Sequence, residues 1–158
     1  MVSLIEAINY RCLHYVRQPL GDFHVLVGPN ASGKTTFLDV VAFLGQLVSD
    51  GLEAAIRERT HNFNDLLWQR SGYGFELAVE AVFPEKYREF IREKNCDAVR
   101  YEVSIGINPQ TGEVGINAEK VLLKKRETIL MVSGQQEFPK FKAAPNTLMS
   151  PRARNNTQ

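Results

Sequence analysis

The residues with the clearest chemistry lie between Gly28 and Thr36. They fit the pattern G-x-x-x-x-G-K-[ST] at every required position. The backbone N–H groups of such a loop can surround the phosphates of a nucleotide, and the N-terminus of a following helix adds a favourable dipole. Gly28 and Gly33 have no Cβ, which allows close approach and unusual backbone angles. We therefore expect a nucleotide-binding loop here.

The residues of this loop have separate expected roles. The ammonium of Lys34 should lie on the β- and γ-phosphates, which makes Lys34 the candidate catalytic residue. The hydroxyl of Thr35 should bind Mg²⁺, an ion that keeps several waters and uses few protein ligands. Thr36 is placed to reach the α-phosphate. The candidate residues for binding ATP and Mg²⁺ are Gly28, Pro29, Asn30, Ala31, Ser32, Gly33, Lys34, Thr35 and Thr36.

The segments that flank this loop predict how it is held. The apolar run 23–27 before the loop predicts a buried strand. Apolar residues at helical spacing after it predict a helix over about 34–48. An N-terminal strand over 2–8, joined to 23–27 through a polar connector, would form a hairpin that leads into the loop. A second helix is expected over 51–59, opened by a capping box of Asp50 and Glu53.

The middle of the chain changes to an alternating pattern. Asn64 should cap a short helical turn, and strands are then expected over 75–83, 99–107, 113–124 and 128–132, with an amphipathic helix beginning at Pro84. We interpret this region as a largely antiparallel sheet with one packed and one solvated face, the latter carrying Glu76 and Glu80.

These patterns predict an α/β fold of the P-loop NTPase class. We divide it into a lobe over 1–138 and a polar tail over 139–158. Within the lobe, 1–60 hold strands, the loop and helices, and 61–138 are mainly antiparallel β structure.

Composition narrows the classes of function. The 158 residues suit one domain, and 44% are hydrophobic, enough for a core. A formal charge of +1 argues against gripping nucleic acid by bulk charge. Cys12 and Cys96 fit no zinc or disulfide pattern, and the three histidines are scattered singly. No apolar run is long enough to span a membrane, so we expect a cytoplasmic protein without a membrane partner.

A complete catalytic site also needs an apolar strand that ends in an acidic residue. The strand expected over 128–132 ends in Ser133, and the strand over 75–83 runs into Pro84. The sequence therefore contains half of a catalytic site. The segment 132–136 imitates an L-S-G-G-Q signature, but it lacks the second glycine and a following helix, so we interpret it as chance.

Residues 5–11 and 23–41 resemble the N-terminal lobe of ABC-type ATPases in the SMC/RecF/OLD branch, many of whose members are called AAA-family ATPases. In that branch an N-[FY]-[RK] element, here Asn9-Tyr10-Arg11, precedes the strand that leads into the loop. This sequence has Ala31 where the family usually has glycine, and Thr35 where it usually has serine. Neither change removes a phosphate contact. The resemblance covers about residues 2–85.

The resemblance implies further site residues. It places Arg11 near the nucleotide, where its guanidinium suits phosphate; a solvated surface charge is the alternative. It also implies a glutamine that senses the γ-phosphate, for which Gln69, Gln135, Gln136 and Gln158 are all candidates. Trp68 with Phe63 could stack on a base, although core packing is the favoured interpretation for both.

The function implied by the resemblance is that of an ATP-driven dimer. ATP would be sandwiched between this loop and the signature motif of a second protomer, and hydrolysis would release the dimer. The family implies work on DNA in repair, recombination or phage defence. It also implies that this chain is the N-terminal part of a longer protein, an incomplete fold that on its own hydrolyses little ATP.

Two other classes stay open. A complete small P-loop kinase would need a lid with arginines, for which Arg57, Arg59 and Arg70 are available. A nucleotide-binding module that never hydrolyses is the non-enzymatic alternative. A GTPase is disfavoured because no N/T-K-x-D motif is present.

Overall fold

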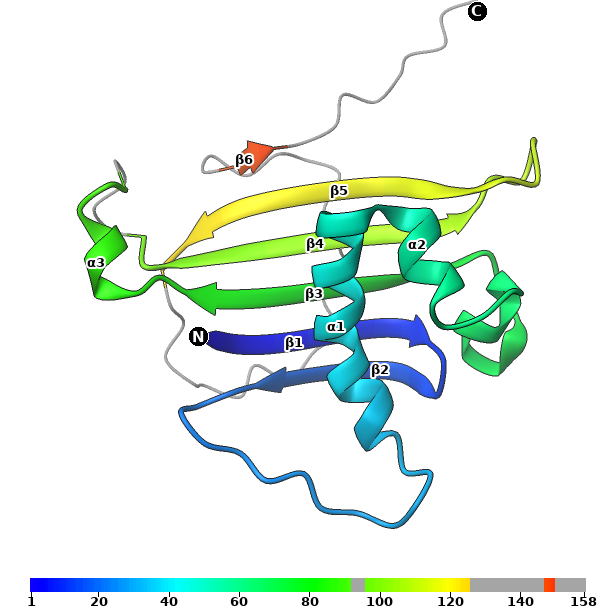
Figure 1. Ribbon diagram of the computed structural model, residues 1–158, viewed down its shortest axis with the longest axis horizontal. Helices are drawn as coiled ribbons and strands as arrows, with labels where there is room; N and C mark the ends of the chain where they lie inside the picture. Colours follow the sequence, from blue (N-terminus) through cyan, green and yellow to red (C-terminus); the bar gives the residue numbers. More distant parts are fainter. Residues whose placement is uncertain (92–95, 126–146, 150–158) are drawn as a thin grey trace, which may run out of the picture.

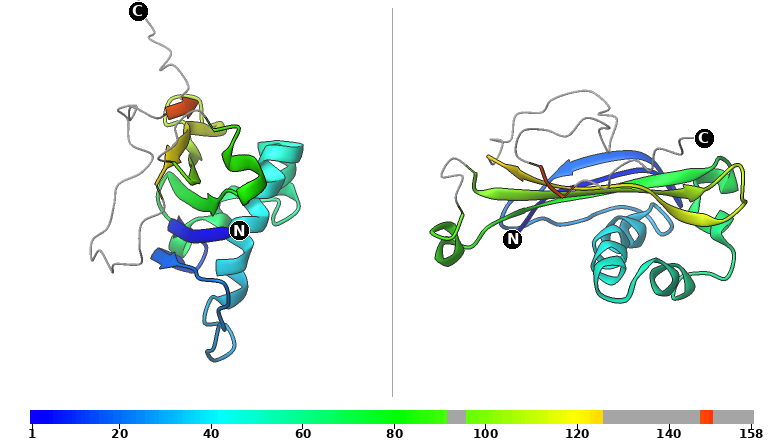
Figure 2. Two further views of the ribbon diagram at one scale, coloured as in Figure 1. Left: turned by 90° about the vertical axis from the view of Figure 1, so that its left-hand side faces the viewer. Right: turned by 90° about the horizontal axis from the view of Figure 1, so that it is seen from above.

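The computed structural model describes residues 1–91, 96–125 and 147–149. Within them, one antiparallel sheet of six strands in the order β2-β1-β3-β4-β5-β6 carries the helices α1 and α2 on one face (Figures 1 and 2). The strands are β1 Val2–Tyr10, β2 Leu13–Pro19, β3 Gly74–Val82, β4 Ala98–Ile107, β5 Val114–Lys124 and β6 Thr147–Met149. The helices are α1 Lys34–Asp50, α2 Leu52–Arg57, η1 Phe63–Leu66, η2 Trp68–Arg70 and α3 Glu85–Arg88. None of the described helices is long and apolar enough to cross a membrane.

The expected N-terminal strand, the helix after the loop and the three alternating strands of the middle region are confirmed. The hairpin partner is not the expected one: β1 pairs with β2 at Leu13–Pro19, immediately after a tight turn, instead of with residues 23–27. The prediction of a buried strand over 23–27 is wrong. Phe23 is 83% exposed and Val27 88% exposed, and the segment runs outside the sheet (Figure 1). An apolar run needs a neighbouring strand for its N–H and C=O groups, and the described sheet offers it none.

Three helix boundaries differ from expectation. The Asp50–Glu53 capping box does not form, because Gly51 with φ 88° occupies the N-cap of α2 without a side-chain cap. The cap of η1 is Asn62, whose side chain accepts a hydrogen bond from the backbone N–H of Asn64. The helix after Pro84 is a single turn, and its expected apolar face is not packed, since Tyr87 is half exposed and Phe90 more so.

The core lies between the sheet and α1. Its centre is an aromatic cluster of Tyr10, Phe43 and Phe75, whose ring centroids lie 5.0–5.8 Å apart. Such edge-on and tilted contacts add to the burial of apolar area. Because Phe43 belongs to α1 and Tyr10 ends β1, this cluster fixes the helix that carries the loop against the middle of the sheet.

The middle of the opposite face of the sheet is buried, which corrects the expectation of a solvated face. Five charged side chains are buried there: Glu6, Glu80, Arg100, Glu102 and Lys120. Arg100 lies at their centre and pairs with Glu6 on β1, Glu80 on β3 and Glu102 on its own strand, β4. Burial lowers the pKa of Arg100, but the carboxylates of Glu102 and Glu6 outweigh it and hold the pKa above its usual value. Charges can be buried here because they neutralise one another.

Some expectations lie outside the described residues. These are the strand over 128–132, the signature-like segment 132–136 and most of the tail over 139–158. The short strand β6 belongs to that last segment and pairs with β5.

Candidate phosphate-binding site

The loop over 28–33 leads into the N-terminus of α1, which begins at Lys34. The ammonium of Lys34 points back into the loop and donates hydrogen bonds to the carbonyl oxygens of Gly28, at 2.8 Å, and Pro29, at 2.6 Å, and to the hydroxyl of Ser32 at 3.3 Å. The first backbone N–H groups of a helix have no partner within it, so this end of α1 can receive an anion. The ammonium of Lys34 and the first backbone N–H groups of α1 therefore lie together at the loop.

Backbone conformation explains the residue types in the loop. Gly33 has φ 91°, and a Cβ there would lie 3.1 Å from the sulfur of Cys12. A Cβ on Gly28 would lie 2.8 Å from the hydroxyl of Ser32. Ala31 also has a positive φ, of 63°, which explains why glycine is usual at this place. The loop accepts alanine there at a cost of about 1 kcal/mol.

A pocket of about 240 Å³ opens at this point. It is lined by Cys12, Asn30, Ala31, Ser32, Gly33, Lys34, Thr35 and Thr36. The thiol of Cys12 donates a hydrogen bond to the hydroxyl of Thr36 at 3.3 Å. Sequence analysis did not place Cys12 at this site, although its position directly after Arg11 is a usable signal.

The donors present fit Mg²⁺ accompanied by phosphates. Thr35 is exposed at the first turn of α1 and lines the pocket. In the described part of the chain, no group of three or more His, Cys, Asp or Glu side chains could hold a metal ion. The hydroxyl of Thr35 would suit Mg²⁺, because this ion takes most of its shell from water and phosphate oxygens and needs few protein ligands.

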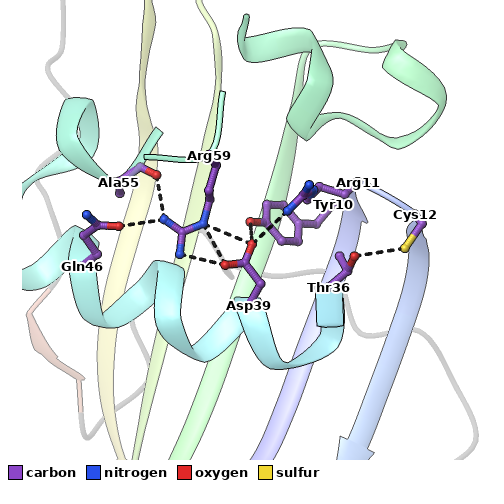
Figure 3. Close-up of polar contacts among 8 residues, drawn as sticks. All are labelled: Tyr10, Arg11, Cys12, Thr36, Asp39, Gln46, Ala55 and Arg59. Atoms are coloured by element: carbon purple, nitrogen blue, oxygen red, sulfur yellow. Dashed lines mark hydrogen bonds and ion pairs between the residues drawn. The ribbon is translucent and has the colours of Figure 1, made fainter. Parts of the chain in front are cut away.

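Arg11 does not point into the loop. Its guanidinium turns toward Asp39 on α1, with Nη1 3.4 Å from Oδ2 (Figure 3). Asp39 also accepts hydrogen bonds from the hydroxyl of Tyr10, at 2.6 Å, and from Arg59. Sequence analysis missed Asp39 in this role; the usable signal is a carboxylate just after the loop on a largely apolar helix.

The ionisation of Asp39 follows from these neighbours. Burial raises the pKa of Asp39, but hydrogen bonds from Arg59 and Tyr10 and the charges of Arg59 and Arg11 outweigh burial, so the pKa lies below its usual value. Burial lowers the pKa of Arg59, and Asp39 more than compensates. Burial and the hydrogen bond to Asp39 raise the pKa of Tyr10. Asp39 is therefore ionised, and Tyr10 is a neutral donor, at neutral pH.

The other candidate residues lie away from the pocket. Gln69 is exposed on η2 and does not line it. Phe63 stacks on Phe75 and belongs to the core, whereas Trp68 packs on His14 with ring centroids 4.3 Å apart. Gln135, Gln136 and Gln158 lie outside the described residues.

The proposed lid arginines are all engaged elsewhere. Arg59 is held by Asp39, Arg57 pairs with Glu53 and Arg70 pairs with Asp65. None of the three lines the phosphate pocket.

The described residues form a mixed α/β fold in which a glycine-rich loop opens a long helix, an arrangement typical of P-loop proteins. Residues 23–129 match the family described as "AAA domain, putative AbiEii toxin, Type IV TA system". This match covers more than half of the chain, and the chain belongs to that family.

A relative supports the same branch. The OLD nuclease of Thermus scotoductus (strain ATCC 700910 / SA-01) is 42% identical over 41 residues, which are 26% of this chain and 8% of that protein. Family and relative together confirm the expected resemblance to the OLD-like branch of AAA/ABC-type ATPases. The match spans only a small part of the relative's length.

Proposed function

We propose that this chain is the ATP-binding part of an OLD-like ATPase, in which the loop over 28–36 holds the nucleotide phosphates together with Mg²⁺. The observation that carries the proposal is the position of Lys34. Its ammonium lies inside the loop, held by carbonyl oxygens that a phosphate can replace. A phosphate oxygen bears more negative charge than a carbonyl oxygen and is the stronger partner for an ammonium.

Each residue then has a defined task. Lys34 exchanges the carbonyls of Gly28 and Pro29 for phosphate oxygens, and the N–H groups at the start of α1 donate to the same anion. Thr35 supplies a hydroxyl ligand to Mg²⁺, which when bound neutralises charge on the phosphates. The hydroxyl of Thr36 accepts a hydrogen bond from Cys12 and can donate its own hydrogen to the nucleotide at the same time.

Hydrolysis needs a group that positions the attacking water. None of the described residues that line the pocket is acidic, and the nearby carboxylate of Asp39 is engaged by two arginines and a tyrosine. We therefore propose that the chain on its own binds ATP but turns it over slowly. Rapid hydrolysis would follow ATP-driven pairing with a second protomer in the full protein, and the name of the OLD nuclease relative supports a link to nucleic acid.

The same observation favours one other function, a nucleotide-binding module that never hydrolyses ATP. A full-length protein with ATPase activity that requires Lys34 would exclude it. A full-length protein that binds ATP without turnover would support it.

The proposal is tested by replacing Lys34 with alanine and measuring binding of Mg·ATP by calorimetry. Lys86→Ala is the matched control, because Lys86 is an exposed lysine outside the pocket. We expect Lys34→Ala to weaken binding at least tenfold, since each 1.4 kcal/mol lost is a factor of about ten. Equal binding by the two variants would exclude this loop as the site.

Alkylation of the cysteines gives a second readout of the same site. Cys12 lines the pocket, and Cys96 lies just before β4, outside it. We expect Mg·ATP to slow the modification of Cys12 by iodoacetamide and to leave that of Cys96 unchanged, as followed by mass spectrometry. Protection of Cys12 should disappear in Lys34→Ala.

A further inference from the structure

A cluster of charged and polar side chains lies beside the phosphate pocket, on the face of α1 that looks toward the end of β1 (Figure 3). At its centre is Asp39, and around it are Tyr10, Arg11 and Arg59. None of these four lines the pocket, but Cys12, the residue after Arg11, does. The cluster and the phosphate pocket are therefore connected through adjacent residues of the chain, Arg11 and Cys12.

The two arginines hold Asp39 very unequally. Arg59 contacts both carboxylate oxygens, with Nη2 2.8 Å from Oδ1 and Nε 3.1 Å from Oδ2, and its side chain is 9% exposed. Arg59 is also anchored by Gln46, at 2.7 Å, by the carbonyl of Ala55, at 2.8 Å, and by the ring of Phe43. Because hydrogen bonds hold this planar guanidinium on two edges, Arg59 stays paired with Asp39.

Arg11 is the exchangeable partner. In the described part of the chain its guanidinium makes one contact, of 3.4 Å to Oδ2 of Asp39, and its side chain is 41% exposed. Since Arg59 already neutralises Asp39, the carboxylate holds Arg11 only weakly. A solvated ion pair of this kind contributes about 0–1 kcal/mol.

The backbone of Arg11, in contrast, is fixed. Its N–H donates to the carbonyl of Leu66 at 2.8 Å. Its φ is 52°, and Asn9 has φ 56°, so the turn on both sides of Tyr10 is in the left-handed region. Such conformations persist in non-glycine residues only where the surroundings hold them. The guanidinium can change direction while its backbone stays fixed next to Cys12, which lines the pocket.

We propose that Asp39 and Arg59 are positioning residues for nucleotide binding. Without nucleotide, Asp39 pairs with the guanidinium of Arg11. Because Arg59 neutralises Asp39, this pair is weak enough for the guanidinium to leave Asp39 and bind a phosphate of the nucleotide. This inference rests on the proposed function, because it requires a phosphate at the loop. It makes Arg59 important for nucleotide affinity although its guanidinium is buried against Asp39, Gln46 and Ala55.

The test is a double-mutant cycle that joins Arg59→Gln with Arg11→Ala, read as affinity for Mg·ATP. In Arg59→Gln, Arg11 is the remaining cation at Asp39 and the carboxylate holds it more strongly. Phosphate must overcome that stronger ion pair, so the affinity for Mg·ATP should fall about three- to fivefold. In the Arg11→Ala background, the same Arg59→Gln change should alter affinity less than about twofold. A structural defect or a long-range charge effect would instead lower affinity equally in both backgrounds, and that result would overturn the proposal.

A second variant covers the case in which Arg59→Gln does not fold. Asp39→Asn removes the charge that holds Arg11, so affinity should stay the same or rise, whereas loss of affinity that persists in the Arg11→Ala background would contradict the inference. Thermal unfolding of each variant shows whether it is folded at the assay temperature. Failure of the proposed function looks different, since the parent chain would then bind Mg·ATP no better than Lys34→Ala.

Discussion

Ala31 is the residue of the phosphate loop with the least suitable backbone. With φ 63° it adopts the left-handed region, where a β-branched residue is a strong outlier. We expect Ala31→Val to weaken Mg·ATP binding about tenfold, because the strain of about 1–2 kcal/mol falls on the loop conformation that cradles phosphate. Calorimetric titration checks this.

Ala31→Gly is the matched control at the same position, because glycine adopts this conformation freely. It should bind within about threefold of the parent chain. Equal affinity of the valine and parent proteins would show that binding does not need this loop conformation.

Asp39 makes the stability of the protein depend on pH in a defined window. Its folded pKa lies below the ordinary 3.8, so the ionised carboxylate contributes stability above about pH 4, and that contribution is lost as the pH falls through the folded pKa. We expect Asp39→Asn to lower the free energy of unfolding by about 1.5–3 kcal/mol at pH 7.

Urea unfolding of both proteins from pH 3 to pH 8 measures this dependence. The difference between parent and Asp39→Asn should be constant from pH 5 to 8 and should shrink below about pH 4. A difference that stays the same at pH 3 would show that the charge of Asp39 is not what stabilises the fold.

At the scale of elements, the guanidinium of Arg100 on β4 forms ion pairs that link β4 to β1 and β3. Arg100 pairs with Glu6 at 2.8 Å and Glu80 at 3.1 Å, and all three side chains are almost completely buried. We expect Arg100→Ala to lower the free energy of unfolding by about 3–5 kcal/mol, because it leaves buried carboxylates without their main counter-charge. Denaturant unfolding measures the loss.

Arg57→Ala is the control for an exposed pair. Its contact with Glu53 spans one helical turn, at 3.4 Å, and both side chains are mostly in water. Its loss should cost less than about 0.5 kcal/mol. If the two changes cost the same, the buried cluster would not be what joins the strands.

Sequence predicted those elements whose pattern is local. Alternation along β3, β4 and β5 and helical spacing along α1 were sufficient to find them, and the loop motif located the pocket residues from Asn30 to Thr36. The run over 23–27 misled the prediction because local apolarity does not say whether a neighbouring strand exists. Glu80 was expected to face solvent because its counter-charge, Arg100, lies on another strand. Asp39 was missed because its partners Tyr10, Arg11 and Arg59 also lie outside its own element, α1.

At the scale of the whole molecule, the most unusual surface is the extended segment over 23–27. Phe23, Val25 and Val27 are 83%, 66% and 88% exposed, and they lie within five consecutive residues. Exposed apolar segments with unpaired backbone groups favour association. We expect the chain to self-associate with rising concentration, and Val25→Asp to reduce this, as measured by sedimentation velocity.

Phe90→Ser is the control for that experiment, since Phe90 is 76% exposed on a different part of the surface. It should leave association unchanged. Equal effects of both substitutions would indicate non-specific hydrophobic association instead of an interface at 23–27.

The central position of β1 also has a consequence for how the chain folds. β1 finds one neighbour, β2, a few residues away, but the other, β3, only far along the sequence, where Ile5 meets Val79. The phosphate loop and α1 lie inside the long stretch that this pairing closes. Joining distant segments is slow compared with closing a hairpin. The β1–β2 and β3–β4–β5 hairpins should therefore form first, and the phosphate loop should be ordered only when they meet, late in folding.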